Sequence, residues 1–91
     1  MHTTEADVIT QVRGFIQENF LYMRPNFEVG ADDRLLEQGI IDSMGVLEVV
    51  GFLESEFGVL VHDHEITEHN MRSVTSLAHY IAEKRAAQKP A

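Results

Sequence analysis

The 91-residue sequence contains no cysteine and no tryptophan, and it has only two prolines and seven basic residues. Without cysteine the chain forms no disulfide and offers no thiolate, so any thiol chemistry must come from an added group. No apolar run approaches the roughly 20 residues that span a membrane, and the N-terminus lacks the basic-then-apolar order of a signal peptide. We therefore expect a cytoplasmic protein with no membrane insertion.

Basic residues are scarce against fifteen acids, and the formal net charge is −8. Between residues 28 and 68 eleven acids stand against a single base, Arg34. This balance argues against nucleic acid or an anionic membrane as the partner. A solvated acidic surface explains the excess, and so does a docking face for basic partners that are held briefly.

The hydrophobic content of 44% and charged content of 24% are typical of a globular chain. We expect one domain over residues 1–91, with an ordered core from about 4 to 86 and a frayed C-terminal tail.

Apolar residues recur at helical spacing over residues 5–23, over 43–57 and in a last helix capped by Ser73. Asp63 is predicted to cap a short helical turn at residues 65–67. The connection 24–42 has no sustained period, and its apolar residues predict that it packs on the core. The sum is an all-α bundle of three main helices and a short one, closed by a long first loop.

Ser43 stands where this connection turns into the second helix. Asp42 is predicted to be the N-cap, which leaves the Ser43 hydroxyl in the first turn. Unpaired backbone N–H groups and the positive end of the helix dipole suit an anion such as a phosphodiester. The serine is therefore either part of a cap or a place where a phosphate-linked group is attached. A hydrolase nucleophile is disfavoured, because the elbow pattern needs glycine where this chain has Ile41.

Two further features of the sequence each have more than one interpretation. Met44, Leu47 and Gly51, with Glu48 beside them, form a second narrow strip on the serine's side of the helix, either core overspill or an exposed apolar patch. His62, His64 and His69 suggest a zinc or nickel site, although exposed histidines around a polar turn are commonplace, and we expect no metal. No histidine has an evident acid-and-oxyanion setting, so we expect no enzyme activity.

The stretch LLEQGIIDSMGVLEVVGFLESEFGV, residues 35–59, resembles the centre of the acyl carrier and peptidyl carrier proteins. Their motif is Asp-Ser-Leu or Asp-Ser-Met at the start of the second helix, which ends in Glu-x-x-Phe-Gly. These elements stand here at residues 42–44 and 54–58, and the order of helices and loop extends the likeness over about residues 5–84.

The resemblance implies an acyl-carrier-like four-helix bundle in which a phosphopantetheinyl transferase places 4′-phosphopantetheine from coenzyme A on Ser43. Asp42 is the second residue of the cofactor-binding site that it implies. The thiol of this arm would hold an acyl or aminoacyl group as a thioester for partner enzymes. Further partners would be a loading ligase, adenylation enzyme or acyltransferase, and a downstream synthase or transferase of fatty acid or secondary metabolite biosynthesis. Partner-recognition positions carry over to Met44, Leu47, Glu48 and Ile66.

Typical fatty-acid carriers read Gly-Ala-Asp-Ser-Leu-Asp, whereas this chain has Ile40, Ile41, Met44 and Gly45. The Asp-Ser-Met-Gly form resembles discrete carriers of amino acids, such as D-alanyl carrier proteins, or carriers of small biosynthetic clusters. We expect a monomeric stand-alone carrier, and the sequence leaves its cargo open among an amino acid, a fatty acyl chain and an aryl acid. The alternative from another class is an unmodified acidic helical adaptor.

Overall fold

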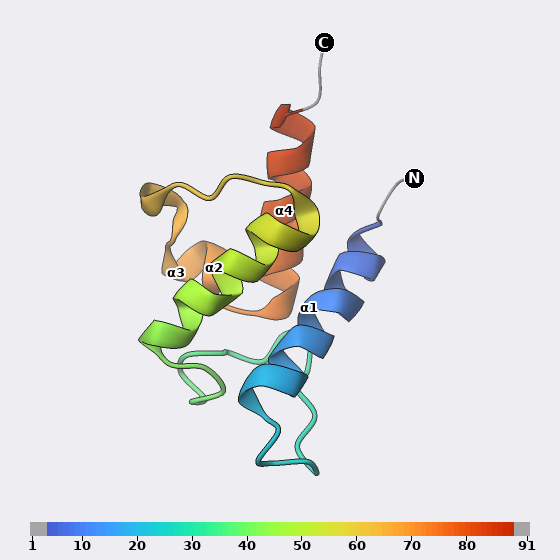
Figure 1. Cartoon of the computed structure of the whole chain (residues 1–91), viewed down its shortest axis with the longest axis vertical. Helices are drawn as coiled ribbons and strands as arrows, with labels where there is room; N and C mark the ends of the chain where they lie inside the picture. Colours follow the sequence, from blue (N-terminus) through green and yellow to red (C-terminus); the bar gives the residue numbers. More distant parts are fainter. Residues whose placement is uncertain (1–3, 89–91) are drawn as a thin grey trace.

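The computed structural model describes residues 4–88, which form an all-helical bundle (Figure 1). The elements are α1 (Glu5–Phe20), α2 (Ser43–Phe57), the 3-10 helix η1 (Asp63–Glu65), α3 (Glu68–Met71) and α4 (Val74–Gln88). The described residues contain no strand, and no helix among them is long and apolar enough to cross a membrane. The predicted all-α bundle of three main helices and a short one is confirmed.

Helix α1 begins at a complete capping box. The Thr4 N–H donates to Asp7 Oδ2 at 3.2 Å, and the Asp7 N–H donates to Thr4 Oγ1 at 3.1 Å. The helix ends at Phe20, so the predicted end at Met23 is wrong. Leu21 leaves the helical conformation with φ −117° and is buried, and the Arg24 N–H closes a turn onto the Leu21 carbonyl at 2.9 Å. The chain thus turns as soon as Leu21 enters the core, before Pro25 is reached.

The core lies where α1, α2 and α4 meet, with α4 packed mainly against α1 and α3 (Figure 1). Its largest fully buried side chains come from the three main helices and the first connection, and they include Ile16, Leu35, Leu53, Leu77 and Ile81. Burying a side chain of this size stabilises the fold by about 1.5–3 kcal/mol. The predicted inward face of the last helix is confirmed, and Ser73 caps that helix by accepting the Ser76 N–H at 3.1 Å.

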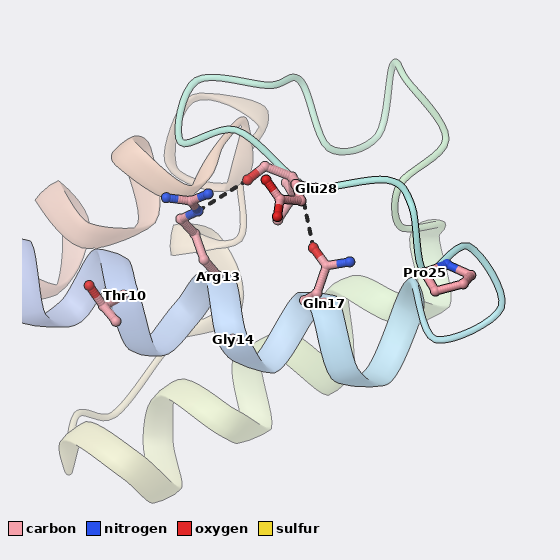
Figure 2. A pocket seen from close by; sticks show the side chains of 7 residues that line it. Thr10, Arg13, Gly14, Gln17, Pro25 and Glu28 are labelled. Carbon is pink, nitrogen blue, oxygen red and sulfur yellow. Dashed lines mark hydrogen bonds between the residues drawn. The ribbon is translucent and has the colours of Figure 1, made fainter.

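The connection 21–42 lies down on the core, as its apolar residues predict. The Gln17 side-chain amide pairs with its backbone: Nε2 donates to the Phe27 carbonyl at 2.6 Å, and the Val29 N–H donates to Oε1 at 3.2 Å. Arg13 Nε donates to the Val29 carbonyl at 3.1 Å (Figure 2). These bonds line an open groove of about 330 Å³ between α1 and the connection. The groove is therefore walled by groups that hold the loop in place.

The link after α2 starts with a left-handed glycine. Gly58 has φ 67°, which L side chains rarely adopt, and its N–H donates to the Glu54 carbonyl at 3.0 Å. The Glu54 side chain then accepts the Val61 N–H at 3.0 Å. Val59 and Val61 are buried.

The predicted single turn at residues 65–67 with Asp63 as its cap is wrong. Asp63 is the first residue of η1, and the cap belongs to α3, where the Asn70 N–H donates to Thr67 Oγ1 at 3.2 Å. Two residue types suited to capping, Asp63 and Thr67, lie close together here, and the fold uses the second. Ile66 consequently lies between η1 and α3 and not on the third helix.

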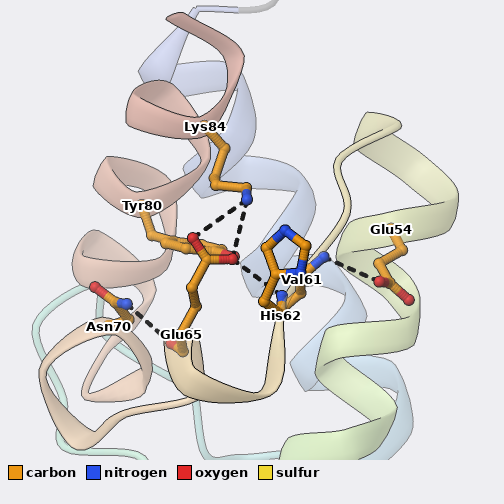
Figure 3. A network of polar contacts seen from close by, with 7 residues as sticks. All are labelled: Glu54, Val61, His62, Glu65, Asn70, Tyr80 and Lys84. Atoms are coloured by element: carbon orange, nitrogen blue, oxygen red, sulfur yellow. Dashed lines mark hydrogen bonds and ion pairs between the residues drawn. The ribbon is translucent and has the colours of Figure 1, made fainter. Parts of the chain in front are cut away.

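A polar cluster fastens η1 to α4 (Figure 3). Glu65 Oε1 accepts the His62 N–H at 3.0 Å, Lys84 Nζ at 2.9 Å and the Tyr80 hydroxyl at 3.1 Å. The bond from the His62 backbone, followed by that from Lys84, lowers the pKa of Glu65 from 4.5 to about 2. Burial and the neighbouring carboxylate raise the pKa of Tyr80, so the phenol stays a donor. The cluster holds the backbone just before Ile66 against α4.

Candidate functional site

Ser43 is the first residue of α2, and its side chain is exposed. Asp42 is the N-cap: its Oδ1 accepts the Gly45 N–H at 2.7 Å, and its carbonyl accepts the Val46 N–H at 3.1 Å. Because Asp42 and not Ser43 is the cap, the Ser43 hydroxyl has no hydrogen bond to the described residues.

The first turn of α2 retains two unused donors. Within residues 4–88, the backbone N–H groups of Ser43 and Met44 donate to no protein acceptor. Such groups, together with the positive end of the helix dipole, attract an anion near the helix start. A phosphodiester on Ser43 Oγ fits this setting.

Gly45 lets α2 approach the end of α1. A Cβ at this position would lie 2.8 Å from Cε1 of Phe20 and 3.3 Å from both Asp42 Oδ1 and the Ile41 Cβ. Contacts below 3.0 Å essentially do not occur, so any larger residue would displace the Phe20 ring or the helix. The glycine that departs from the fatty-acid carrier pattern thus has a local packing reason.

An open hollow of about 260 Å³ lies beside Ser43. It is lined by Leu36, Ser43, Val46, Ile66, Thr67, Glu68 and Met71. The structure therefore brings Ile66 close to Ser43, although the two are 23 positions apart in the sequence. Leu36, which the sequence predicts in the core, is 40% exposed and lines this hollow.

The second strip on α2 is an exposed patch and not core overspill. The side chains of Met44 and Leu47 are 71% and 57% exposed, and Glu48 and Gly51 are exposed beside them. On the other side of Met44, a second open hollow of about 380 Å³ separates α2 from the end of α1 and includes Phe20 and Glu48. Met44 and Leu47 therefore present exposed apolar area on the serine's side of α2.

None of the described histidines lines the hollows beside Ser43 and Met44. The rings of His62 and His64 stack at 5.6 Å between centroids and 6° between planes, whereas His69 lines a separate hollow with His79 and Glu5. In the described part of the chain no three histidine or acidic side chains are grouped so that they could hold a metal ion.

Sequence reasoning missed Thr67, Glu68 and Met71, which line the hollow beside Ser43. Their one visible signal is position: they follow Ile66 in a segment that must return across the bundle from α2 to α4. The link between Glu65 and Lys84 gave no signal at all, because the two are 19 residues apart.

Residues 16–81 match the family described as phosphopantetheine attachment site. The aminoacyl carrier protein 2 of Bradyrhizobium diazoefficiens is 32% identical over 85 residues, which cover 89% of this chain and 90% of that protein. The acyl carrier protein of Rickettsia bellii is 34% identical over 59 residues, which cover 65% of this chain and 66% of that protein.

Proposed function

Because this chain belongs to the phosphopantetheine attachment-site family, we propose that Ser43 is the residue that carries the arm. The chain is a carrier protein that holds acyl or aminoacyl cargo on covalently attached 4′-phosphopantetheine. The arm supplies the thiol on which a thioester forms, which the cysteine-free chain cannot provide. Carrier proteins are generally non-catalytic, and this chain presents its cargo as a single domain while its partner enzymes do the chemistry.

The observation that carries the assignment is the first turn of α2. The Ser43 hydroxyl is exposed and unbonded, with two unpaired N–H groups next to it. On modification, Ser43 Oγ bonds to the phosphorus that bears the pantetheine, the pyrophosphate P–O bond of coenzyme A breaks, and adenosine 3′,5′-bisphosphate leaves. The hydroxyl proton passes to a base of the transferase. The N–H groups of Ser43 and Met44 would hold the phosphodiester anion.

The recognition face on this proposal consists of Met44, Leu47 and Glu48 on α2, with Ile66 across the hollow. Met44 and Leu47 offer exposed apolar area, and Glu48 adds charge within the acidic segment 28–68. Partners with basic residues around an apolar centre suit such a face, since exposed charge speeds encounter more than it strengthens the complex. The partners are a phosphopantetheinyl transferase, a loading enzyme and a downstream transferase or synthase.

The cargo on this proposal is an amino acid. Two features support it: the relative named as an aminoacyl carrier protein aligns over nearly the whole chain, and the motif has the Asp-Ser-Met-Gly form. Fragmentation mass spectrometry of the protein recovered from its native cells tests the cargo, because the arm is ejected together with what it carries. An aminoacyl mass that hydroxylamine removes supports the proposal, and a fatty acyl or aryl mass contradicts it.

The attachment site is tested by intact mass after incubation with coenzyme A, Mg²⁺ and a broad-specificity phosphopantetheinyl transferase. The parent is expected to gain one phosphopantetheine, and Ser43→Ala none. Ser55→Ala, which alters another exposed serine of α2, is the matched control and should be modified like the parent. A folded parent that gains no mass in the presence of an active transferase would leave the acidic adaptor as the function.

A further inference from the structure

The open groove between α1 and the connection 21–42 is polar on both walls. Its α1 wall consists of residues spaced i, i+3, i+4 and i+7, which therefore share one face of the helix: Thr10, Arg13, Gly14 and Gln17. Glu28 lines the opposite wall, on the connection (Figure 2). The volume of about 330 Å³ is at the lower end of the range of pockets that hold small molecules.

The α1 wall carries donors that the fold holds in place and leaves partly unpaired. Arg13 uses only Nε, which donates to the Val29 carbonyl at 3.1 Å, and neither Nη atom has an acceptor among the described residues. Gln17 Nε2 donates one hydrogen to the Phe27 carbonyl and has a second hydrogen to offer. The two Nη atoms of a guanidinium held through Nε remain free to bind a carboxylate with two parallel bonds.

The connection supplies the opposite charge. Glu28 is exposed, and within residues 4–88 its carboxylate accepts no hydrogen bond and forms no ion pair, even with Arg13 across the groove. The connection is held at this point by the bonds of Arg13 and Gln17, and Glu28 takes no part in them. A groove with an unpaired cation on one wall and an unpaired anion on the other is complementary to a small zwitterion.

We propose that this groove is a second binding site, which takes a free α-amino acid. The carboxylate of the ligand accepts hydrogens from the Nη atoms of Arg13, and its ammonium group pairs with the Glu28 carboxylate. The choice of an α-amino acid among small zwitterions rests on the proposed cargo, whereas the site itself does not require the modification of Ser43. A ligand bound in this way joins α1 to the connection and stabilises its position on the core.

The test is a titration of the ¹⁵N-labelled protein with L-alanine, followed through the backbone amide signals of residues 10–17 and 25–30. A saturable shift with a Kd of about 1 mM is expected, because the ligand is small and both charged side chains are exposed. Acetate and methylammonium, which each carry one of the two charges, should bind about fivefold more weakly. Glu28→Gln should weaken alanine binding by a similar factor, while Glu18→Gln, at another exposed acid of α1, matches the parent.

The opposite results overturn the site. The absence of a saturable shift at about 50 mM alanine means that the groove holds no such ligand. Equal affinity for acetate, or an unchanged Kd in Glu28→Gln, means that no zwitterion is recognised. Ser43→Ala should bind alanine like the parent, and a loss of binding there would place the ligand beside Ser43. A folded parent that binds alanine but is not modified by an active transferase contradicts the proposed function and leaves this site standing.

Discussion

Two connections flank α2, and each brings one apolar residue to the hollow beside Ser43. The connection 21–42 before the helix contributes Leu36, and the link 58–67 after it contributes Ile66. The two connections are held in place by hydrogen bonds from different kinds of side chain. The first depends on bonds from the side chains of Gln17 and Arg13 to the loop backbone, whereas the second depends on the carboxylate of Glu65.

Because of this difference, the two sides of the hollow should respond to different substitutions. The Leu36 side is held to α1 by the side chains of Gln17 and Arg13. The Ile66 side is held next to Glu65, whose pKa is lowered to about 2 by the His62 backbone bond and by Lys84. Substitutions can therefore separate the two sides of the hollow.

The largest effect is expected for Gln17→Ala. It removes the side-chain donor to the Phe27 carbonyl and the side-chain acceptor of the Val29 N–H, and Val29 is buried. Leaving these groups unpaired should cost about 2 kcal/mol of unfolding free energy. Chemical denaturation at pH 7 and at pH 5 should give the same loss.

The control is Gln11→Ala, the same exchange elsewhere on α1 at a half-buried side chain with no protein hydrogen bond in the described structure. Its cost should be well below that of Gln17→Ala. Equal costs for the two variants would mean that the amide bonds do not hold the connection.

A smaller and pH-dependent effect is expected for Glu65→Gln. A carboxyl group with a depressed folded-state pKa stabilises the fold fully above its unfolded value of 4.5, and this contribution is lost as the pH falls toward 2. The variant should be less stable than the parent at pH 7, and the difference should close between pH 4.5 and pH 2. Thermal unfolding across this range measures the convergence.

Lys84→Met serves as the partner variant, since it removes the cation and leaves the His62 bond to Glu65. It should raise the lower end of the same pH window, because Lys84 lowers the folded-state pKa of Glu65, and leave the upper end unchanged. A gap between the parent and Glu65→Gln that stays constant from pH 7 to pH 2 would rule out the charged cluster as the fastening.

The smallest effect is expected for Asp42→Ala, where the first connection meets α2. The loss of the cap bond to the Gly45 N–H should cost about 1 kcal/mol of unfolding free energy. Asp42→Asn keeps an acceptor and should restore most of it. Both variants should still be modified on Ser43, so a loss of modification in Asp42→Asn would show that the transferase reads the carboxylate itself.

The sequence predicts the parts of this fold that depend on local spacing. The buried faces of α2 and α4, the caps at Asp42 and Ser73 and the end of α2 at Gly58 follow from residue type and periodicity. The exposed patch at Met44 could be identified only in the structure. The sequence does not indicate whether an apolar side chain outside the main buried face of a helix is covered or exposed.

Features that depend on contacts between distant segments could not be predicted. Leu21 ends α1 by entering the core, and the tripeptide around it carries no breaker that would mark the place. Thr67 caps α3 in preference to Asp63, although both residue types suit a helix start. The ion pair of Glu65 with Lys84 likewise depends on how α4 passes η1, which no local pattern encodes.

The contact between Gly45 and Phe20 has a consequence for engineering this carrier. Helix α2 cannot simply be exchanged for that of another carrier, because its first turn packs closely against one aromatic ring on α1. A recognition helix transplanted from a fatty-acid carrier would bring an aspartate to position 45 and place its Cβ against Phe20. The transplant would therefore have to displace the Phe20 ring or replace it with a smaller side chain, so the two positions must be considered as a pair.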